Sequence, residues 1–283
     1  MERRIVGSMS EWSGVLKDAF RQIDDGSLTI SHFQALTEHR NPFDGGDVLD
    51  QLISKTEKLL SKHFGKKIIV DRIPAEFTEE NLAKWARYNL KPVFLPDEEI
   101  TENREIKNWV KPRRWFYDKI KEGKIARDSA VLKRGWYLAD FSIGVDYAGG
   151  IQVFPNDPLV PIIERLREED KIGKYDKTPM GSRFSIIPRN EYPLVFTELA
   201  KELGLKSEQI LLERCIEFNA IGNLYDSNRG KFNSWEWFFD AFEDSYRLDG
   251  GRRDDGGLAD VDHDWSGIRS GHVAGRPLVS FVK

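Results

Sequence analysis

Apolar residues in the first third of the chain recur every three or four positions, which is the spacing of amphipathic helices. One run covers residues 12–23, with Trp12, Phe20 and Ile23 on its apolar side. A longer run covers residues 48–64, and Gly65 after it suits a helix C-cap. We expect the apolar faces of both helices to be core contacts.

From residue 66 onward, short strands alternate with helices and long loops. Apolar runs bounded by turn residues predict strands at 66–70, 92–96, 135–141, 213–219, 277–282 and the end of the loop 177–187. Capping residues predict helices after Ser31, after Thr78 (with Glu79 and Glu80 in the first turn), and at 115–120, 157–166 and 192–203, the last closed by Gly204. This order predicts an α+β protein, with a mainly helical region at 1–105 and a second domain at 106–283.

Composition narrows the class of protein. The formal net charge is -4, which argues against nucleic acid as a partner, and the basic cluster at Lys111, Arg113 and Arg114 is interpreted as solvated surface. Cys215 is the single cysteine, so no internal disulfide can form and a reducing compartment is expected. No apolar run approaches the roughly 18 residues of a membrane span, and the first twelve residues lack a signal peptide's apolar centre. We therefore expect a cytoplasmic protein without membrane insertion.

The stretch from Arg247 to Gly275 differs from the rest of the chain. It is rich in Gly, Asp and Arg and contains no Lys, Glu, Asn, Gln or Thr. Apolar residues punctuate it, which is typical of a loop-rich surface held by a few buried side chains. These apolar positions are Leu248, Leu258, Val261, Trp265, Val273 and Ala274.

No constellation of catalytic residues is recognisable. His263 and His272 lie near Asp260, Asp262 and Asp264, but these residues lack a fixed metal-ligand spacing. The turn that follows Asp24 resembles a calcium loop, but it lacks the required acidic positions. We therefore expect a protein that is not an enzyme and has no metal and no cofactor. Two alternatives stay open: an enzyme or metal-binding protein that uses the acidic and histidine loop 260–272, and a structural or assembly protein of a virus.

The C-terminal motifs resemble those of a known fold family. The order of these motifs is similar to the end of the C-type lectin fold of the formylglycine-generating-enzyme type. The motifs are Trp235-Glu236-Trp237, Tyr246-Arg247-Leu248-Asp249-Gly250-Gly251, Trp265, Arg269 and Ala274-Gly275-Arg276-Pro277. The resemblance covers about 219–282. Arg252 and Arg253 stand where that family has Ser-Trp, and Gly275 stands where it has Phe. The enzyme of the family needs two active-site cysteines, so its activity is not carried over.

Within this fold type, the chain resembles the variable proteins of diversity-generating retroelements. In such proteins, a reverse transcriptase copies a template with errors at adenines, and these errors diversify C-terminal codons. The absence of Lys, Asn, Gln and Thr from Arg247 to Gly275 fits a loss of adenines from these codons. The resemblance implies a non-enzymatic protein that displays a diversified surface, here about 247–276, to a ligand that we expect to be a protein.

The resemblance also assigns the two sets of positions. The exposed, variable, ligand-binding positions would be Arg252, Arg253, Asp254, Asp255, Asp260, Asp262, His263, Asp264, Gly267, Ile268, Ser270, Gly271 and His272. The scaffold positions would be Gly256, Gly257, Leu258, Ala259, Val261, Trp265, Val273, Ala274 and Arg276.

Overall fold

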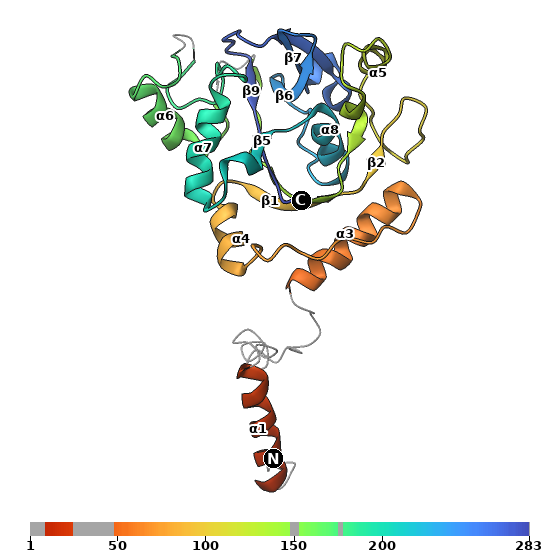
Figure 1. Ribbon diagram of the computed structural model, residues 1–283, viewed down its shortest axis with the longest axis vertical. Helices are drawn as coiled ribbons and strands as arrows, with labels where there is room; N and C mark the ends of the chain where they lie inside the picture. Colours follow the sequence, from red (N-terminus) through yellow and green to blue (C-terminus); the bar gives the residue numbers. More distant parts are fainter. Residues whose placement is uncertain (1–8, 25–47, 148–152, 175–177, 283) are drawn as a thin grey trace. The chain divides into compact units, whose positions relative to one another are not determined.

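A computed structural model describes residues 9–24, 48–147, 153–174 and 178–282 (Figure 1). The chain divides into two compact units, Met1–Ser54 and Lys55–Lys283. The helix expected after Ser31 and most of the calcium-like turn lie outside the described residues. Among the described helices, none combines the length and apolar character needed to cross a bilayer.

In the first unit, α1 (Met9–Asp24) confirms the helix expected at 12–23. Contrary to the expectation of core contacts, the side chains of Leu16, Phe20 and Ile23 are exposed. The next helix, α3 (Val48–Phe64), has the predicted bounds. Gly65 follows it at a φ of 66°, the left-handed conformation that glycine adopts at helix ends.

The second unit is a mixed α+β structure with helices around and between small sheets. Its helices are α4 (Glu79–Ala86), α5 (Arg114–Lys121), α6 (Val160–Glu168), α7 (Tyr192–Leu203) and α8 (Cys215–Leu224). Its strands are β1 (Leu90–Leu95), β2 (Glu98–Glu99), β3 (Val131–Leu132), β4 (Gly135–Asp140), β5 (Ile210–Leu212), β6 (Trp235–Phe242), β7 (Tyr246–Gly250), β8 (Val261–Trp265), β9 (Val273–Gly275) and β10 (Pro277–Ser280). Short 3-10 turns are η1 (Arg127–Ala130), η3 (Ser207–Gln209), η4 (Arg253–Asp255) and η5 (Gly257–Ala259).

Two four-stranded sheets organise this unit. One has the strand order β1-β4-β10-β5 and the other β8-β7-β6-β9, while β2 pairs with β3. Figure 1 shows α8 between the two sheets, with α7 beside β5 and α6 on the other side of α7. Strand β1 pairs with β4 along its whole length, so the compact unit starts well before the boundary expected at residues 105 and 106.

Several predicted elements occur as expected for local reasons. Thr78 caps α4 by accepting a hydrogen bond from the Asn81 amide at 3.2 Å. Helix α7 begins at Tyr192 and ends at Leu203, followed by the C-cap Gly204, whose φ of 71° is left-handed. Strand β4 is buried along its whole length, which explains its continuous apolar sequence.

Three strand predictions are wrong. Residues 66–70 form no strand; instead the Ile68 amide donates to Ser61 Oγ at 2.9 Å. The loop 177–187 does not end in a strand either. Residues 215–219 begin α8, because Glu217 accepts from the Arg214 amide at 2.9 Å and caps the helix start. Helix α8 is buried on nearly all sides, and a fully buried helix has a continuous apolar sequence like that of a buried strand.

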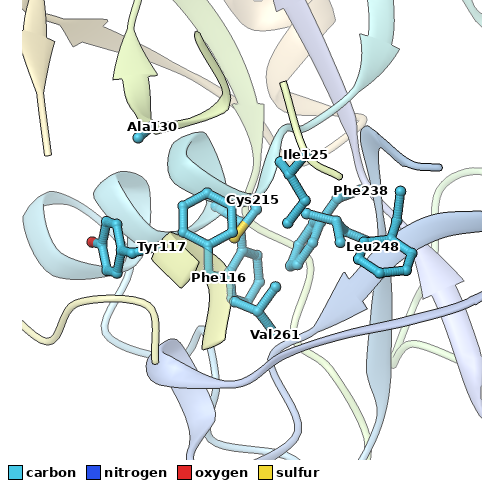
Figure 2. Packing of buried hydrophobic residues seen from close by; sticks show 10 residues of the cluster. Phe116, Tyr117, Ile125, Ala130, Cys215, Phe238, Leu248 and Val261 are labelled. Carbon is cyan, nitrogen blue, oxygen red and sulfur yellow. The ribbon is translucent and has the colours of Figure 1, made fainter. Parts of the chain in front are cut away.

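A hydrophobic cluster lies beneath the sheet β8-β7-β6-β9. Figure 2 shows side chains from α5, α8 and three strands of this sheet meeting around Cys215, Phe238 and Leu248. Cys215 is a buried apolar residue, as predicted, and burial raises the pKa of its thiol well above the usual value.

Buried ion pairs tie the strands and loops together. Arg183 binds Asp140 and Asp157, each at 2.5 Å. Arg276 donates to Glu236 at 2.9 Å and to the Ser142 carbonyl at 2.5 Å. Arg229 pairs in the same way with Glu213. We call these three arginines and their carboxylate partners the buried frame. A buried charge needs such partners, because an unpaired one is strongly destabilising.

Candidate ligand-binding face

The stretch 247–276 is anchored by the sheet β8-β7-β6-β9. Leu248 of β7, Val261 of β8 and Val273 of β9 are each at most 3% exposed, so these apolar positions are buried as predicted. Strand β8 is an edge strand that pairs with β7, with His263 opposite Leu248 and Asp262 opposite Asp249. Neighbouring residues of β8 therefore point to opposite faces of the sheet.

The loop between β7 and β8 has a firmly held backbone. The Arg253 amide donates to the Phe232 carbonyl, and the Gly257 amide to the Arg252 carbonyl, both at 2.8 Å. Gly257 has a φ of 62°, and a Cβ there would lie 2.6 Å from the Gly230 carbonyl oxygen. Only glycine fits this crossing of two backbones. The side chains of Arg253, Asp254 and Asp255 stay exposed above it.

Asp260 is predicted to be exposed, but it is buried, with 2% of its surface accessible. Its carboxylate accepts the Arg252 amide at 3.1 Å and lies 3.6 Å from Arg113. Burial raises the pKa of Asp260 to about 6. Asp260 thus holds the loop from below, which is a structural role.

An aromatic group surrounds one end of this loop. The Arg252 guanidinium lies 4.4 Å from the ring centroid of Trp235, and His272 stacks on the same ring at 5.8 Å. The ring of Tyr147 lies 3.8 Å from that of His272. Burial and then the charge of Arg252 lower the pKa of His272, which favours its neutral imidazole. We call these four residues the Trp235 cluster.

A second aromatic group holds His263. Its ring stacks on Trp115 at 5.4 Å and lies 4.1 Å from Phe242 and 5.5 Å from Tyr246. These rings hold His263 half-buried at the edge of the hydrophobic cluster. Asp262, on the opposite face of β8, is exposed and pairs with Arg113 at 3.2 Å. Arg113 is therefore part of this site and not free solvated surface.

The end of β8 and the loop that follows it each depart from the prediction at one position. Trp265, expected in the scaffold, is 55% exposed, and it borders a cavity with Ser245 and Arg189. Gly271, expected on the surface, is buried. The loop is held by the Ser185 amide, which donates to the Ser270 carbonyl at 2.9 Å.

The structure groups the sequence-predicted positions by exposure. Arg253, Asp254, Asp255 and Asp262 are exposed; Arg252, His263, Asp264, Gly267, Ile268, Ser270 and His272 are half-buried; Asp260 and Gly271 are buried. Of the scaffold positions, Gly257, Val261, Val273, Ala274 and Arg276 are buried, Leu258 and Ala259 are half-buried, and Gly256 and Trp265 are exposed. We call the exposed and half-buried side chains of the first set, together with Trp265, the display surface.

Several residues of the site were missed from the sequence. Trp235 supports Arg252 and His272, and Trp115 supports His263; the sequence places Trp235 only in the Trp-Glu-Trp motif and Trp115 only at the start of a helix. Asn233 holds Asp254 through its amide nitrogen at 2.6 Å. Asp146 pairs with Arg253 at 3.2 Å from more than a hundred positions away in the sequence. Only long-range folding brings these groups together, so no local pattern could reveal them.

The acidic residues of β7 and β8 do not form a chelating site. Asp249 is 5% exposed, and burial, followed by the charges of Asp262, Asp264 and Asp260, raises its pKa well above the usual value. That shift favours the protonated carboxyl. Within the described part of the chain, no group of three or more His, Cys, Asp or Glu side chains could hold a metal ion. What the site offers is a mixture of guanidinium donors, carboxylate acceptors and aromatic rings.

In comparisons with known proteins, the chain matches no protein-family model, no curated protein and no solved structure.

Proposed function

We propose that this protein is a non-enzymatic binding protein that presents a diversified surface to a protein ligand, in the manner of retroelement variable proteins on a C-type lectin-like scaffold. The observation that carries the proposal is the separation between backbone support and exposed side chains in the β7–β8 loop. Its amides bind the carbonyls of Phe232 and Arg252 and the carboxylate of Asp260. The side chains of Arg253 and Asp255 contribute to none of these bonds.

Such an arrangement lets side chains change while the loop keeps its shape. Surface substitutions away from caps, buried polar groups and special backbone conformations alter stability little. Here the special conformations belong to glycines of the loop, such as Gly257. The exposed positions can then alter what the protein binds without altering the fold.

The chemistry of the display surface favours a protein ligand. Arg252 and Arg253 can form paired hydrogen bonds with carboxylates, and Asp254 and Asp262 can accept from Arg or Lys of a partner. Trp265 adds a large exposed ring of the type enriched at binding hot spots. The lectin-like scaffold is proposed on the C-terminal motifs and on the short strands, helices and long loops of the second unit. We also keep the cytoplasm as the proposed location.

Sequencing this gene across its source population tests the proposal. We expect substitutions confined to codons of the display surface and arising at adenines of a near-copy repeat. Codons for Asp260, Gly271 and the buried frame should be constant. A uniform gene with no such repeat nearby would contradict the proposal.

A further inference from the structure

A cavity of about 270 Å³ lies away from the Trp235 cluster, between α7, the segment from η3 to β5, and the strands β6 and β7. Its apolar walls come from Phe196 of α7, Leu211 and Leu212 of β5, and Phe239 of β6. Figure 1 shows α7 and β5 side by side at this place. The volume is below the roughly 300–1,000 Å³ that is common for drug-sized ligands, so a small molecule would suit it.

Two large apolar side chains at the cavity remain accessible to water. Leu211 is 45% exposed and Phe239 is 43% exposed, although the neighbouring Leu212 and Phe238 are buried. Covering such side chains with an apolar ligand is favourable because it removes their surface from water. The cavity therefore has an apolar part that an apolar ligand would cover.

The same cavity is lined by two arginines, Arg189 and Arg247. Neither forms an ion pair with a carboxylate of the described residues. The Arg247 guanidinium lies 5.7 Å from the ring centroid of Phe239 and donates one hydrogen bond to the Phe239 carbonyl. Its Nε is buried without a partner in the described chain. Burial and then the charge of Arg189 lower the pKa of Arg247.

Arg247 differs in this respect from the arginines of the buried frame. Arg183, Arg229 and Arg276 each have at least one carboxylate partner. Arg167 also lacks one, but it is 1% exposed and donates to the Phe184 carbonyl inside the protein. Arg247 instead borders an open cavity, where an anion from solution could provide the missing partner.

We propose that this cavity binds a small carboxylate with an apolar body, its carboxylate held by Arg247 and Arg189 and its body packed against Phe239, Leu211 and Phe196. Glu208 also lines the cavity and accepts a hydrogen bond from Ser207 at 3.5 Å. The ligand's carboxylate accordingly lies on the Arg247 side. The cavity contains none of the positions assigned as variable, although Arg247 begins the stretch 247–276 and Arg189 also borders the cavity at Trp265.

Calorimetric titration of the full chain with phenylacetate, its neutral amide phenylacetamide, and inorganic phosphate tests the proposal. We expect saturable binding of phenylacetate, and binding at least about tenfold weaker for the amide, since a charge-assisted hydrogen bond is lost. Phosphate should also bind more weakly, because it has no apolar body. R247Q should weaken phenylacetate binding by a similar factor.

The matched control is R253Q, which removes an exposed arginine outside the cavity and should leave phenylacetate binding unchanged. If R247Q does not fold, as judged by circular dichroism, R189Q tests the same charge pair. Equal binding of acid and amide, no effect of the arginine variants, or no saturable binding of phenylacetate would each overturn the proposal. Tighter binding of a peptide that ends in phenylalanine would overturn the small-molecule assignment and indicate a chain terminus instead.

Discussion

Arg276 and Arg253 belong to the same C-terminal stretch, yet the protein uses them in opposite ways. Arg276 is 4% exposed and binds Glu236 and two backbone carbonyls. The side chain of Arg253 is 48% exposed, and its partners, Asp146 and Asp254, are about as exposed. Exposed ion pairs contribute little to stability, whereas one buried charge without its partner costs several kcal/mol. The two residues therefore mark which positions of the stretch are constrained and which can vary.

The largest effect is expected from breaking the buried frame. R276A would remove the donor to the Glu236 carboxylate and the Ser142 carbonyl, and should lower the free energy of unfolding by about 3–5 kcal/mol. The urea midpoint of unfolding measures this change. R253A is the control and should differ from the parent protein by no more than about 0.5 kcal/mol. Equal midpoints for the two variants would remove the distinction between frame and surface.

A smaller loss is expected at the crossing of Gly257 and Gly230. G257A places a Cβ 2.6 Å from a backbone oxygen in a left-handed conformation, and should destabilise the protein by about 2 kcal/mol or more. G123A is the matched control, because Gly123 has a φ of 76° but open space where the Cβ would lie. Thermal unfolding compares the two variants. A loss for G257A no larger than that for G123A would show that the crossing does not constrain the loop.

Asp260 makes the free energy of unfolding depend on pH, which distinguishes this buried residue from the exposed ones. Its folded-state pKa is raised to about 6, above the unfolded value of about 3.9. The folded state therefore binds more protons between these values, and this residue's contribution makes the free energy of unfolding fall as pH rises through that window. D260N should remove about 2–3 kcal/mol of that pH dependence. Urea unfolding of the parent protein and of D260N at several pH values measures this difference. Asp249 and Glu213 are present in both proteins, so their titration does not contribute to the difference. Parallel stability profiles would contradict the buried, structural role of Asp260.

The smallest effect is expected on the display surface. The triple variant R253A/D254A/D255A removes exposed ion pairs and the hydrogen bond between Asn233 and Asp254. It should change the free energy of unfolding by less than about 1 kcal/mol. Differential scanning calorimetry against the parent protein provides the measurement. A loss as large as that of R276A would mean that these side chains support the loop.

The sequence predicts local elements well where local forces decide them. Helix α3 with Gly65, helix α4 with its Thr78 cap, and strand β4 follow from spacing, capping and apolar runs. The apolar run at Cys215 predicts a strand although the segment begins helix α8, because a helix buried on all sides loses the periodicity that marks helices. The apolar spacing of residues 12–23 predicts the helix α1, but the spacing alone does not predict the exposure of Leu16 and Phe20.

The candidate site was predictable only in part. The apolar residues Leu248, Val261 and Val273 are buried, as their residue type predicts. Of the positions that the resemblance assigns to the surface, only Arg253, Asp254, Asp255 and Asp262 are exposed. The composition could not show that Asp260 points inward, because its partners Arg113 and the Arg252 amide meet it only in the folded loop. Composition likewise could not show that Trp265 is exposed on edge strand β8, where a large apolar residue normally indicates burial. These outcomes depend on tertiary contacts.

The most direct measurement is a display library in which the codons of Arg253, Asp254, Asp255, Asp262 and Trp265 are randomised together, scored for resistance to protease. A matched library randomises Asp260, Gly257, Gly230, Arg276 and Glu236. We expect most members of the first library to remain folded and almost none of the second. Similar folded fractions in the two libraries would contradict the claim that a constant frame carries a changeable surface.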